Sequence, residues 1–360
     1  MNEQSCSKAI VLYSDMGLGN WLLLGPILKE LSNKTKYKIV LVEFSGKSPW
    51  VYINCLGLNV DVLRVDSRVR IRFLRYASLG IELRKRSKHY EKRVLFGRHT
   101  RSLKNIFLKI FFNCNLNLCY LLPDDKKKLI YSLLGVRTIK YPLEIHERDA
   151  NKELARKLFS NLPNLSGSDN SFPIEKSNYG GLGNYCILQP ISEKNQSWKR
   201  WPADNWIQLI EALIQKTGLT ILIVGLESEK EEIDNLIANF AEGFLGRRCQ
   251  NLAGQTSLPQ LGAIVKDAQF SIGADSSIGH ISATIGTRTV ALIGPGGDGR
   301  SPGGSMTTVL SPSCKCNPRK TLLKKNLKLV RKCGGQCMRK ISVEQVFDAL
   351  RDKSVLGELR

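Results

Sequence analysis

The segment GADSSIGHISATIG places an aspartate, two serines and a histidine within six positions. We expect an apolar strand to end at Gly273, and Asp275, Ser276 and Ser277 to open a helix whose first turn carries His280. Backbone N–H groups at a helix N-terminus bind phosphate, and hydroxyl or imidazole groups beside them add donors. The segment therefore predicts a pyrophosphate site. The alternative is an ordinary Asp/Ser helix cap followed by a helical histidine.

Two further clusters follow apolar strands. In EKNQSWKRWPADNW, Lys194, Lys199 and Arg200 lie between a strand and a helix, where cations can neutralise a diphosphate leaving group. A solvated loop is the alternative for these charges. In GLESEKEE, Glu229 stands at or near a helix start, where it can contact a ligand or simply complement the helix dipole.

A glycine-rich turn, SDMGLGNWLLLGPILKEL, stands between the first expected strand and the first expected helix. It ends on Asn20, whose amide can orient a hydroxyl but cannot accept its proton. Asp15, five residues earlier, supplies the carboxylate that a general base requires. Asp15 can instead stabilise the turn through its own backbone contacts.

Strand-like and helix-like segments alternate around these clusters. The first section predicts a strand over 8–14, a helix over 21–34 and a strand over 37–44, which is a βαβ unit. The polar stretch over 160–184 indicates an interdomain linker. From 185 to 295, continuous apolar strands alternate with helices, which predicts a doubly wound parallel sheet. Two such halves would hold a ligand in the crevice at the carboxyl ends of their strands.

The charge is strongly positive and uneven. The 360 residues carry a formal net charge of +22, and the stretch 64–109 has fifteen Lys or Arg against three acidic residues. Such an excess favours a polyanion such as an anionic glycan, a lipid surface or nucleic acid, although a solvated helical face gives the same pattern. No nucleic-acid-binding motif is present, so we expect no nucleic-acid partner.

The chain shows no apolar run of the ~20 residues that span a bilayer, and its N-terminus lacks the pattern of a secretory signal. We therefore expect a cytoplasmic protein that contacts the inner face of the membrane peripherally. The apolar stretch IFLKIFFNCNLNLCYLL, within the basic middle section, predicts either a buried segment or an interfacial one. Burial is the more common fate of a short apolar run.

Ten cysteines in a cytosolic chain are expected to be thiols or metal ligands rather than disulfides. Cys314, Cys316, Cys333 and Cys337 form two close pairs near the C-terminus. Four thiolates can hold a structural zinc ion, but neither pair has the Cys-X-X-Cys spacing. Free thiols are therefore the competing interpretation.

With these clusters in this order, the chain resembles glycosyltransferase family 9, the ADP-heptose:lipopolysaccharide heptosyltransferases and their relatives. The resemblance is carried by KRWPADNWIQLIEAL, LIVGLESEKEEI, the run from Asn251 to Pro295, and GLGNWLLLGPILKEL. It covers about two thirds of the chain. It implies the GT-B fold, two Rossmann-like doubly wound α/β domains that face a central cleft, and an inverting sugar transfer that needs no metal or other cofactor.

The resemblance also assigns roles to single residues. It places the donor-phosphate lysine on Lys199, the ribose-contacting acid on Glu229 and a nucleotide neighbour on Thr256. The phosphate-binding helix start falls on Asp275, Ser276, Ser277 and His280, and Ser192 is a further phosphate ligand. The family typically has Leu-Gly-Asp where this chain has Asn20, and that Asp acts as the base for the acceptor hydroxyl. Asp15 is its substitute here, and other branches of the family also carry Asn.

These inferences predict an acceptor-binding domain over 1–172, a nucleotide-sugar-binding domain over 178–340 and a C-terminal helix over 341–360. The expected reaction moves a sugar, heptose from ADP-heptose, to a lipopolysaccharide core or a related anionic glycan. One alternative is a GT-B transferase that places another nucleotide sugar, such as a hexose or N-acetylhexosamine, on O-antigen or protein. The other is a non-catalytic protein that binds sugar nucleotides or polyanions.

Overall fold

The structure is a computed structural model of the whole chain. The residues that it describes are 8–14, 18–43, 50–58, 60–64, 81, 84, 85, 90, 92–97, 109, 110, 114, 116–121, 128–142, 144–162, 165, 172–175, 184–192, 194–238, 248–295, 298–316 and 324–351. The chain divides into two compact units, Met1–Ser171 and Phe172–Arg360.

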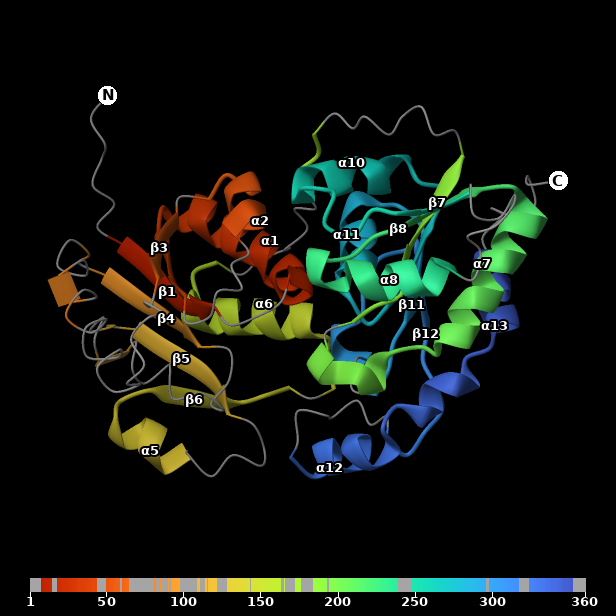
Figure 1. Ribbon diagram of the computed structural model, residues 1–360. Helices are drawn as coiled ribbons and strands as arrows, with labels where there is room; N and C mark the ends of the chain where they lie inside the picture. Colours follow the sequence, from red (N-terminus) through yellow and green to blue (C-terminus); the bar gives the residue numbers. More distant parts are fainter. Residues whose placement is uncertain are drawn as a thin grey trace. The chain divides into compact units, whose positions relative to one another are not determined.

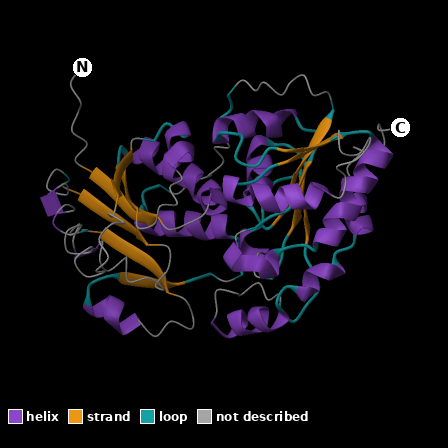
Figure 2. Cartoon of the chain, viewed as in Figure 1, coloured by secondary structure: helices purple, strands orange, loops and turns teal. Residues whose placement is uncertain are grey.

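The first unit is built on a parallel sheet, shown in orange in Figure 2. Its strand order is β3-β2-β1-β4-β5-β6, the order of a doubly wound nucleotide-binding fold. The strands are β1 (Lys8–Ser14), β2 (Lys38–Glu43), β3 (Val60–Arg64), β4 (Lys92–Gly97), β5 (Leu116–Leu121) and β6 (Arg137–Lys140). The helices are α1 (Leu18–Thr35), α2 (Trp50–Cys55), α5 (Lys128–Leu133) and α6 (Glu147–Leu158).

Helix α1 and helix α6 pack against each other in this unit. Along α1 the sequence WLLLGPIL is buried almost without exception, as expected for a helix enclosed by a sheet and a second helix. The hydroxyl of Tyr120, on β5, donates to the carbonyl of Ala150 at 2.6 Å and so ties α6 to the sheet. The first unit therefore has a well-defined apolar core, although its sequence is basic.

The second unit repeats the same topology, and Figure 1 shows its sheet between two layers of helices. Its strand order is β12-β11-β10-β7-β8-β9, again fully parallel. The strands are β7 (Tyr185–Gln189), β8 (Thr220–Ile223), β9 (Cys249–Asn251), β10 (Ser271–Ala274), β11 (Thr289–Leu292) and β12 (Thr307–Leu310). The helices are α7 (Ala203–Thr217), α8 (Lys230–Ile237), α10 (Leu258–Asp267), α11 (Ser277–Ile285), α12 (Lys324–Cys333) and α13 (Val343–Arg351). The short 3₁₀ turns are η1 (Lys194–Lys199), η2 (Glu227–Glu229), η4 (Asp298–Arg300) and η5 (Gln336–Lys340).

The two faces of this sheet carry different kinds of side chain. Large apolar side chains such as Ile272 and Leu292 join α7, α8 and α13 in one core cluster. The other face carries small or polar residues under α11. There the Ser271 hydroxyl lies 2.7 Å from that of Ser282 on α11, and it donates to Thr289 Oγ1 at 2.8 Å. Small side chains let α11 approach the sheet closely and so fix its N-terminus.

The basic middle section is only partly described. The LNLCYL part of its apolar stretch forms β5, where Leu118, Cys119 and Tyr120 are buried, so the expectation of burial is confirmed for this part. In the IFLKIFF part only Lys109 and Ile110 lie within the described residues, and Ile110 is 45% exposed. Most of the basic stretch 64–109 lies outside them. Among the described helices none has the length and apolar character to cross a bilayer.

Candidate functional site

The centre of the second sheet brings two sequence clusters into contact. Strands β7 and β10 are neighbours although they are far apart in sequence, and the strand order reverses between them. Ligands of doubly wound sheets bind at this reversal, outside the carboxyl ends of the strands. The segment after β7 ends with Lys199, and Asp275 directly follows β10. Lys199 Nζ lies 2.7 Å from Asp275 Oδ2, and both side chains are mostly buried.

Helix α11 starts immediately after this ion pair. Ser276 is its N-cap residue, but the Ser276 hydroxyl donates to the Ala274 carbonyl at 2.8 Å and does not cap the helix. Ser277 is the first helical residue and is half-buried, and His280, in the first turn, is 8% exposed. The residues of the phosphate-site prediction thus gather at one helix N-terminus, as that prediction requires. Contact with a donor stays a prediction for each of them.

Gln189 is a residue of this site that the sequence analysis missed. It is the last residue of β7, and its side-chain Oε1 accepts a hydrogen bond from the backbone N–H of Ile278 at 3.0 Å. The contact couples the end of β7 to the start of α11. A glutamine at a strand end resembles any surface polar residue, so only the sheet topology reveals this role.

Close backbone contact holds Lys199 in place. Gly294 follows β11, and a Cβ atom on it would stand 2.9 Å from Lys199 Cα and 3.3 Å from the sulfur of Met338. Only a residue without a side chain fits this gap. The η1 segment therefore packs directly on the turn after β11, which positions Lys199 beside Asp275.

Arg200 and Ser192 belong to the same segment. The Arg200 guanidinium donates to the Ser192 carbonyl at 3.0 Å and pairs with Glu232 on α8 at 2.5 Å. Arg200 therefore connects this segment to α8. Ser192 is buried, and its hydroxyl has no hydrogen-bond partner among the described residues. Its contact with a phosphate stays a prediction. A cavity of about 540 Å³ beside η1 is lined in part by Arg200, Glu232 and Arg339, and not by Lys199 or Asp275.

Glu229 makes a local contact in the turn before α8. Its Oε2 accepts a hydrogen bond from the backbone N–H of Leu226 at 2.8 Å, within the turn that precedes α8. The side chain is buried. The ribose contact of Glu229 stays a prediction.

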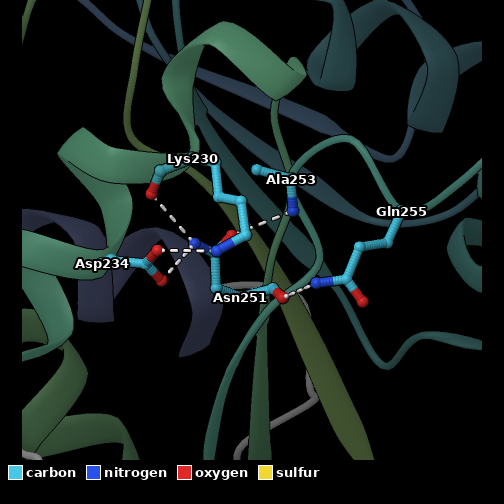
Figure 3. A network of polar contacts seen from close by, with 5 residues as sticks. All are labelled: Lys230, Asp234, Asn251, Ala253 and Gln255. Atoms are coloured by element: carbon cyan, nitrogen blue, oxygen red, sulfur yellow. Dashed lines mark hydrogen bonds and ion pairs between the residues drawn. The ribbon is translucent and has the colours of Figure 1, made fainter.

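Thr256 is half-buried in the turn between β9 and α10. Figure 3 shows the network that fixes this turn around Asn251. The Asn251 amide donates to Asp234 at 2.7 Å and to the Lys230 carbonyl at 3.1 Å, while its Oδ1 accepts from the Ala253 N–H at 2.9 Å. The network ties the turn to α8, so the position of Thr256 depends on an asparagine five residues before it.

All of these candidates lie on the side of the sheet where the carboxyl ends of the strands are found. Ser192 and Lys199 follow β7, Glu229 follows β8, Thr256 follows β9, and Asp275 begins the group after β10. Because the strands are parallel, their carboxyl ends meet at the same edge. The structure brings Lys199 and Asp275 into direct contact and places the others along that edge.

The first unit has a comparable position at the start of α1. Asn20 is the third residue of α1 and is half-buried, just beyond the carboxyl end of β1, which neighbours β4 at the strand-order reversal. Asp15 lies outside the described residues. Its role as a base therefore stays a prediction.

The four C-terminal cysteines converge. Cys316 Sγ lies 2.9 Å from Cys314 Sγ and 3.4 Å from Cys337 Sγ, and all four Sγ atoms, including that of Cys333, lie within 4.8 Å of one another. Burial alone would raise the pKa of Cys333. Hydrogen bonds from the N–H of Cys337, from neighbouring thiols and from the N–H of Gly335 outweigh burial and lower this pKa to about 7.

Two doubly wound parallel units define an α/β protein of two Rossmann-like halves. The chain belongs to glycosyltransferase family 9 (heptosyltransferase), whose model matches residues 137–329, more than half of the chain. It is 32% identical over 115 residues to lipopolysaccharide heptosyltransferase 3 of Escherichia coli strain K12, a match that spans 32% of each chain. The matched segment is thus about a third of that relative's length.

Solved structures match the fold over almost the whole length of the chain. A glycosyltransferase family 9 protein from Veillonella parvula superposes with a TM-score of 0.70 at 17% identity, over 99% of both chains. The E. coli heptosyltransferase WaaC with ADP gives 0.63 at 15% identity, over 96% of this chain and 100% of that one. At these identities the likeness concerns the fold, which is GT-B as the sequence resemblance implied.

Proposed function

We propose that this protein is an inverting glycosyltransferase that moves a heptose from ADP-heptose to a lipopolysaccharide core or a related anionic glycan. The observation that carries the proposal is the Lys199–Asp275 pair at the start of α11, beside Ser276 and Ser277. A lysine beside the N-terminus of a helix can stabilise the charge that develops on a departing nucleoside diphosphate. Membership of the family and the ADP named for WaaC support the choice of donor.

In this proposal the second unit binds the donor. Asp275 holds the Lys199 ammonium at the N-terminus of α11. The Asp275 carboxylate neutralises part of the lysine's charge. The helix dipole and its N–H groups therefore supply a substantial share of the attraction for phosphate. Because these protein groups can neutralise the leaving group, the proposed transfer uses no catalytic metal.

The first unit would bind the acceptor. Its basic sequence complements the phosphates of a lipopolysaccharide core, and the turn from Asp15 to Asn20 would meet the acceptor hydroxyl. This turn lies outside the matched residues 137–329. The proposal extends to a peripheral position at the inner face of the cytoplasmic membrane, where such acceptors are assembled.

A turnover assay over a donor panel tests the proposal. Purified protein, a deacylated lipopolysaccharide core and ADP-heptose should give a glycosylated product by mass spectrometry, and anomeric NMR should show inversion. ADP-linked sugars should support turnover, whereas UDP- and GDP-linked hexoses and N-acetylhexosamines should not. Activity with a UDP- or GDP-linked sugar alone would show that the donor is not ADP-heptose. Absence of turnover with every donor, despite ADP binding, would favour a non-catalytic sugar-nucleotide-binding protein.

A further inference from the structure

Helix α5, in the first unit, exposes a set of large apolar side chains. Leu129 and Leu133 are 68% and 77% exposed. Ile130 is 47% exposed, and Leu134, directly after the helix, is 39% exposed. The N–H of Leu134 donates to the Ile130 carbonyl at 3.1 Å, so Leu134 continues the last helical turn. Residues four positions apart lie on the same side of a helix. These four side chains therefore form one apolar surface, which we call the α5 patch.

The other side of α5 is anchored in the core. Tyr131 is fully buried and packs with Val136 and with Cys119 of β5. Gly135 adopts a φ of +69°, and its N–H donates to the Ser132 carbonyl at 3.0 Å. The N–H of Val136 donates to the Tyr131 carbonyl at 2.8 Å, which completes a Schellman motif at the end of the helix. The fold thus fixes the helix with its apolar patch turned outward.

Cationic side chains lie next to the α5 patch. Lys128 is the first residue of the helix, and α5 packs against β6, whose first and last residues, Arg137 and Lys140, are exposed (Figure 1). A Cβ on Gly135 would stand 3.9 Å from Lys109 Cε, so the Lys109 side chain also reaches the end of the helix. An apolar surface bordered by cations is typical of a region that inserts at the headgroup boundary of an anionic bilayer.

Charge and size distinguish between a lipid surface and a second copy of this chain as the occupant of the patch. The stretch 124–140 holds five Lys or Arg against two Asp, and the whole chain carries a net charge of +22. A second copy would bring the same cations against these, and such like-charge contacts are unfavourable. A stable protein interface also uses about 20–30 residues from each partner, many more than the four apolar side chains of the patch. An anionic lipid surface attracts the cations and accepts the apolar side chains.

We propose that α5 is a membrane-docking element, in which the α5 patch inserts at the headgroup boundary of an anionic bilayer while the neighbouring cations contact lipid phosphates. The inference rests on the peripheral membrane position given in the proposed function, and it names the surface that makes the contact. It differs from a purely electrostatic contact through the basic stretch 64–109. Salt should weaken the binding by screening the cations, and the binding that remains in salt should depend on Leu129 and Leu133.

Vesicle co-sedimentation of the full-length chain tests the patch. With vesicles of phosphatidylethanolamine and phosphatidylglycerol, the double variant Leu129→Ser/Leu133→Ser should bind about tenfold more weakly than wild type, at low and at physiological salt. Its urea midpoint should be close to that of wild type, because both side chains are exposed. The matched control is Ile174→Ser in the second unit, whose side chain is about as exposed as that of Ile130, and it should bind as wild type does. Equal binding of the double variant and wild type would overturn the proposal.

A variant that adds apolar surface gives a second, independent measurement. Leu133→Trp should bind these vesicles more tightly than wild type, because an indole is favourable at the membrane interface. Brominated phosphatidylglycerol should quench its tryptophan fluorescence beyond the quenching seen in wild type. No additional quenching would show that the patch does not enter the bilayer. In sedimentation velocity, a wild-type dimer that the double variant dissociates, with vesicle binding unchanged, would assign the patch to self-association and so contradict the proposal.

Transfer assays separate this inference from the proposed reaction. With a water-soluble deacylated acceptor, the double variant should have the kcat/KM of wild type. With lipopolysaccharide embedded in vesicles, its activity should fall in proportion to the lost vesicle binding. Vesicle binding itself needs no sugar donor. If the chain binds vesicles through α5 and transfers no sugar, the docking surface stands and only the proposed reaction fails.

Discussion

Asp15 and Asn20 raise the sharpest question at the scale of single residues. The resemblance to the family places a base where this chain has an amide, and Asn20 stands in the first turn of α1, beyond the carboxyl end of β1. If Asp15 accepts the proton of the acceptor hydroxyl, Asp15→Asn should lower kcat by about 10²–10⁴ and leave donor binding unchanged. Steady-state kinetics and ADP calorimetry on the same preparation measure both quantities.

The reciprocal substitution is the control for this prediction. Asn20→Asp, introduced into the Asp15→Asn background, should restore part of the lost kcat, because the new carboxylate would stand where the family's base is expected. A fully active Asp15→Asn variant that gains nothing from Asn20→Asp would show that the turn only admits the acceptor.

The residues of the proposed donor site differ in how far sequence could predict them. The resemblance selected Lys199 and Asp275, and the structure joins them because the strands before them are neighbours. Gln189 escaped prediction, since its role depends on a contact with Ile278 across 89 positions. The C-terminal cysteines were recognised as a possible site, but their irregular spacing could not show that α12 and η5 bring the thiols together.

Among the secondary-structure elements, the close packing of η1 on the turn after β11 determines where Lys199 lies. Gly294→Ala would place a methyl group 2.9 Å from Lys199 Cα, so the turn after β11 and the η1 segment must shift relative to each other, and we expect the Lys199–Asp275 contact to be disturbed. We expect kcat/KM to fall about tenfold or more, since small displacements of a charge-stabilising group are costly to catalysis. Gly299→Ala is the matched control, because its Cβ would meet nothing within 4 Å. Equal activity of both variants would contradict this positioning role.

The link between α8 and the β9–α10 turn predicts a pH dependence of stability. Hydrogen bonds from Lys230 and Asn251 lower the pKa of Asp234 below its ordinary value. A lowered pKa in the folded state stabilises the fold above the ordinary carboxyl value, and this contribution is lost as the pH falls through the lowered value. Urea midpoints of wild type and Asp234→Asn should therefore differ at neutral pH and converge below about pH 4. Glu231→Gln, exposed on the same helix, is the control, and a gap that persists in acid would contradict the role of Asp234.

Sequence patterns predicted the elements of the second half better than those of the first. Strands such as YCILQ and SIGA are continuous apolar runs because helices cover both of their faces. In contrast, β3 (VDVLR) and β4 (KRVLFG) carry charges within or beside their apolar residues, so the basic composition conceals them. Strand β12 (TTVL) is a half-buried edge strand whose residues lack a clear apolar pattern. Whether these three segments form strands depends on their packing partners, which the composition does not show.

At the scale of the whole molecule, the net charge of +22 predicts salt-sensitive binding to an anionic surface. Association with phosphatidylglycerol vesicles or with lipopolysaccharide should fall steeply between low and physiological salt, since exposed charges are screened beyond about 10 Å at 0.1 M. Vesicle co-sedimentation over a salt series measures it, with phosphatidylcholine vesicles as the uncharged control. Binding that does not depend on salt would indicate apolar insertion instead.

We propose that Lys199 and the start of α11 hold the diphosphate of the donor, and isothermal titration calorimetry with ADP measures this contribution. Wild-type protein should bind ADP, and Lys199→Ala should bind it about 10–100 times more weakly, since a hydrogen bond to a charged group contributes about 1.5–3 kcal/mol. Lys266→Ala, which removes an exposed lysine from α10, should bind ADP as wild type does. An ADP affinity that is unchanged in Lys199→Ala would show that Lys199 does not bind the diphosphate.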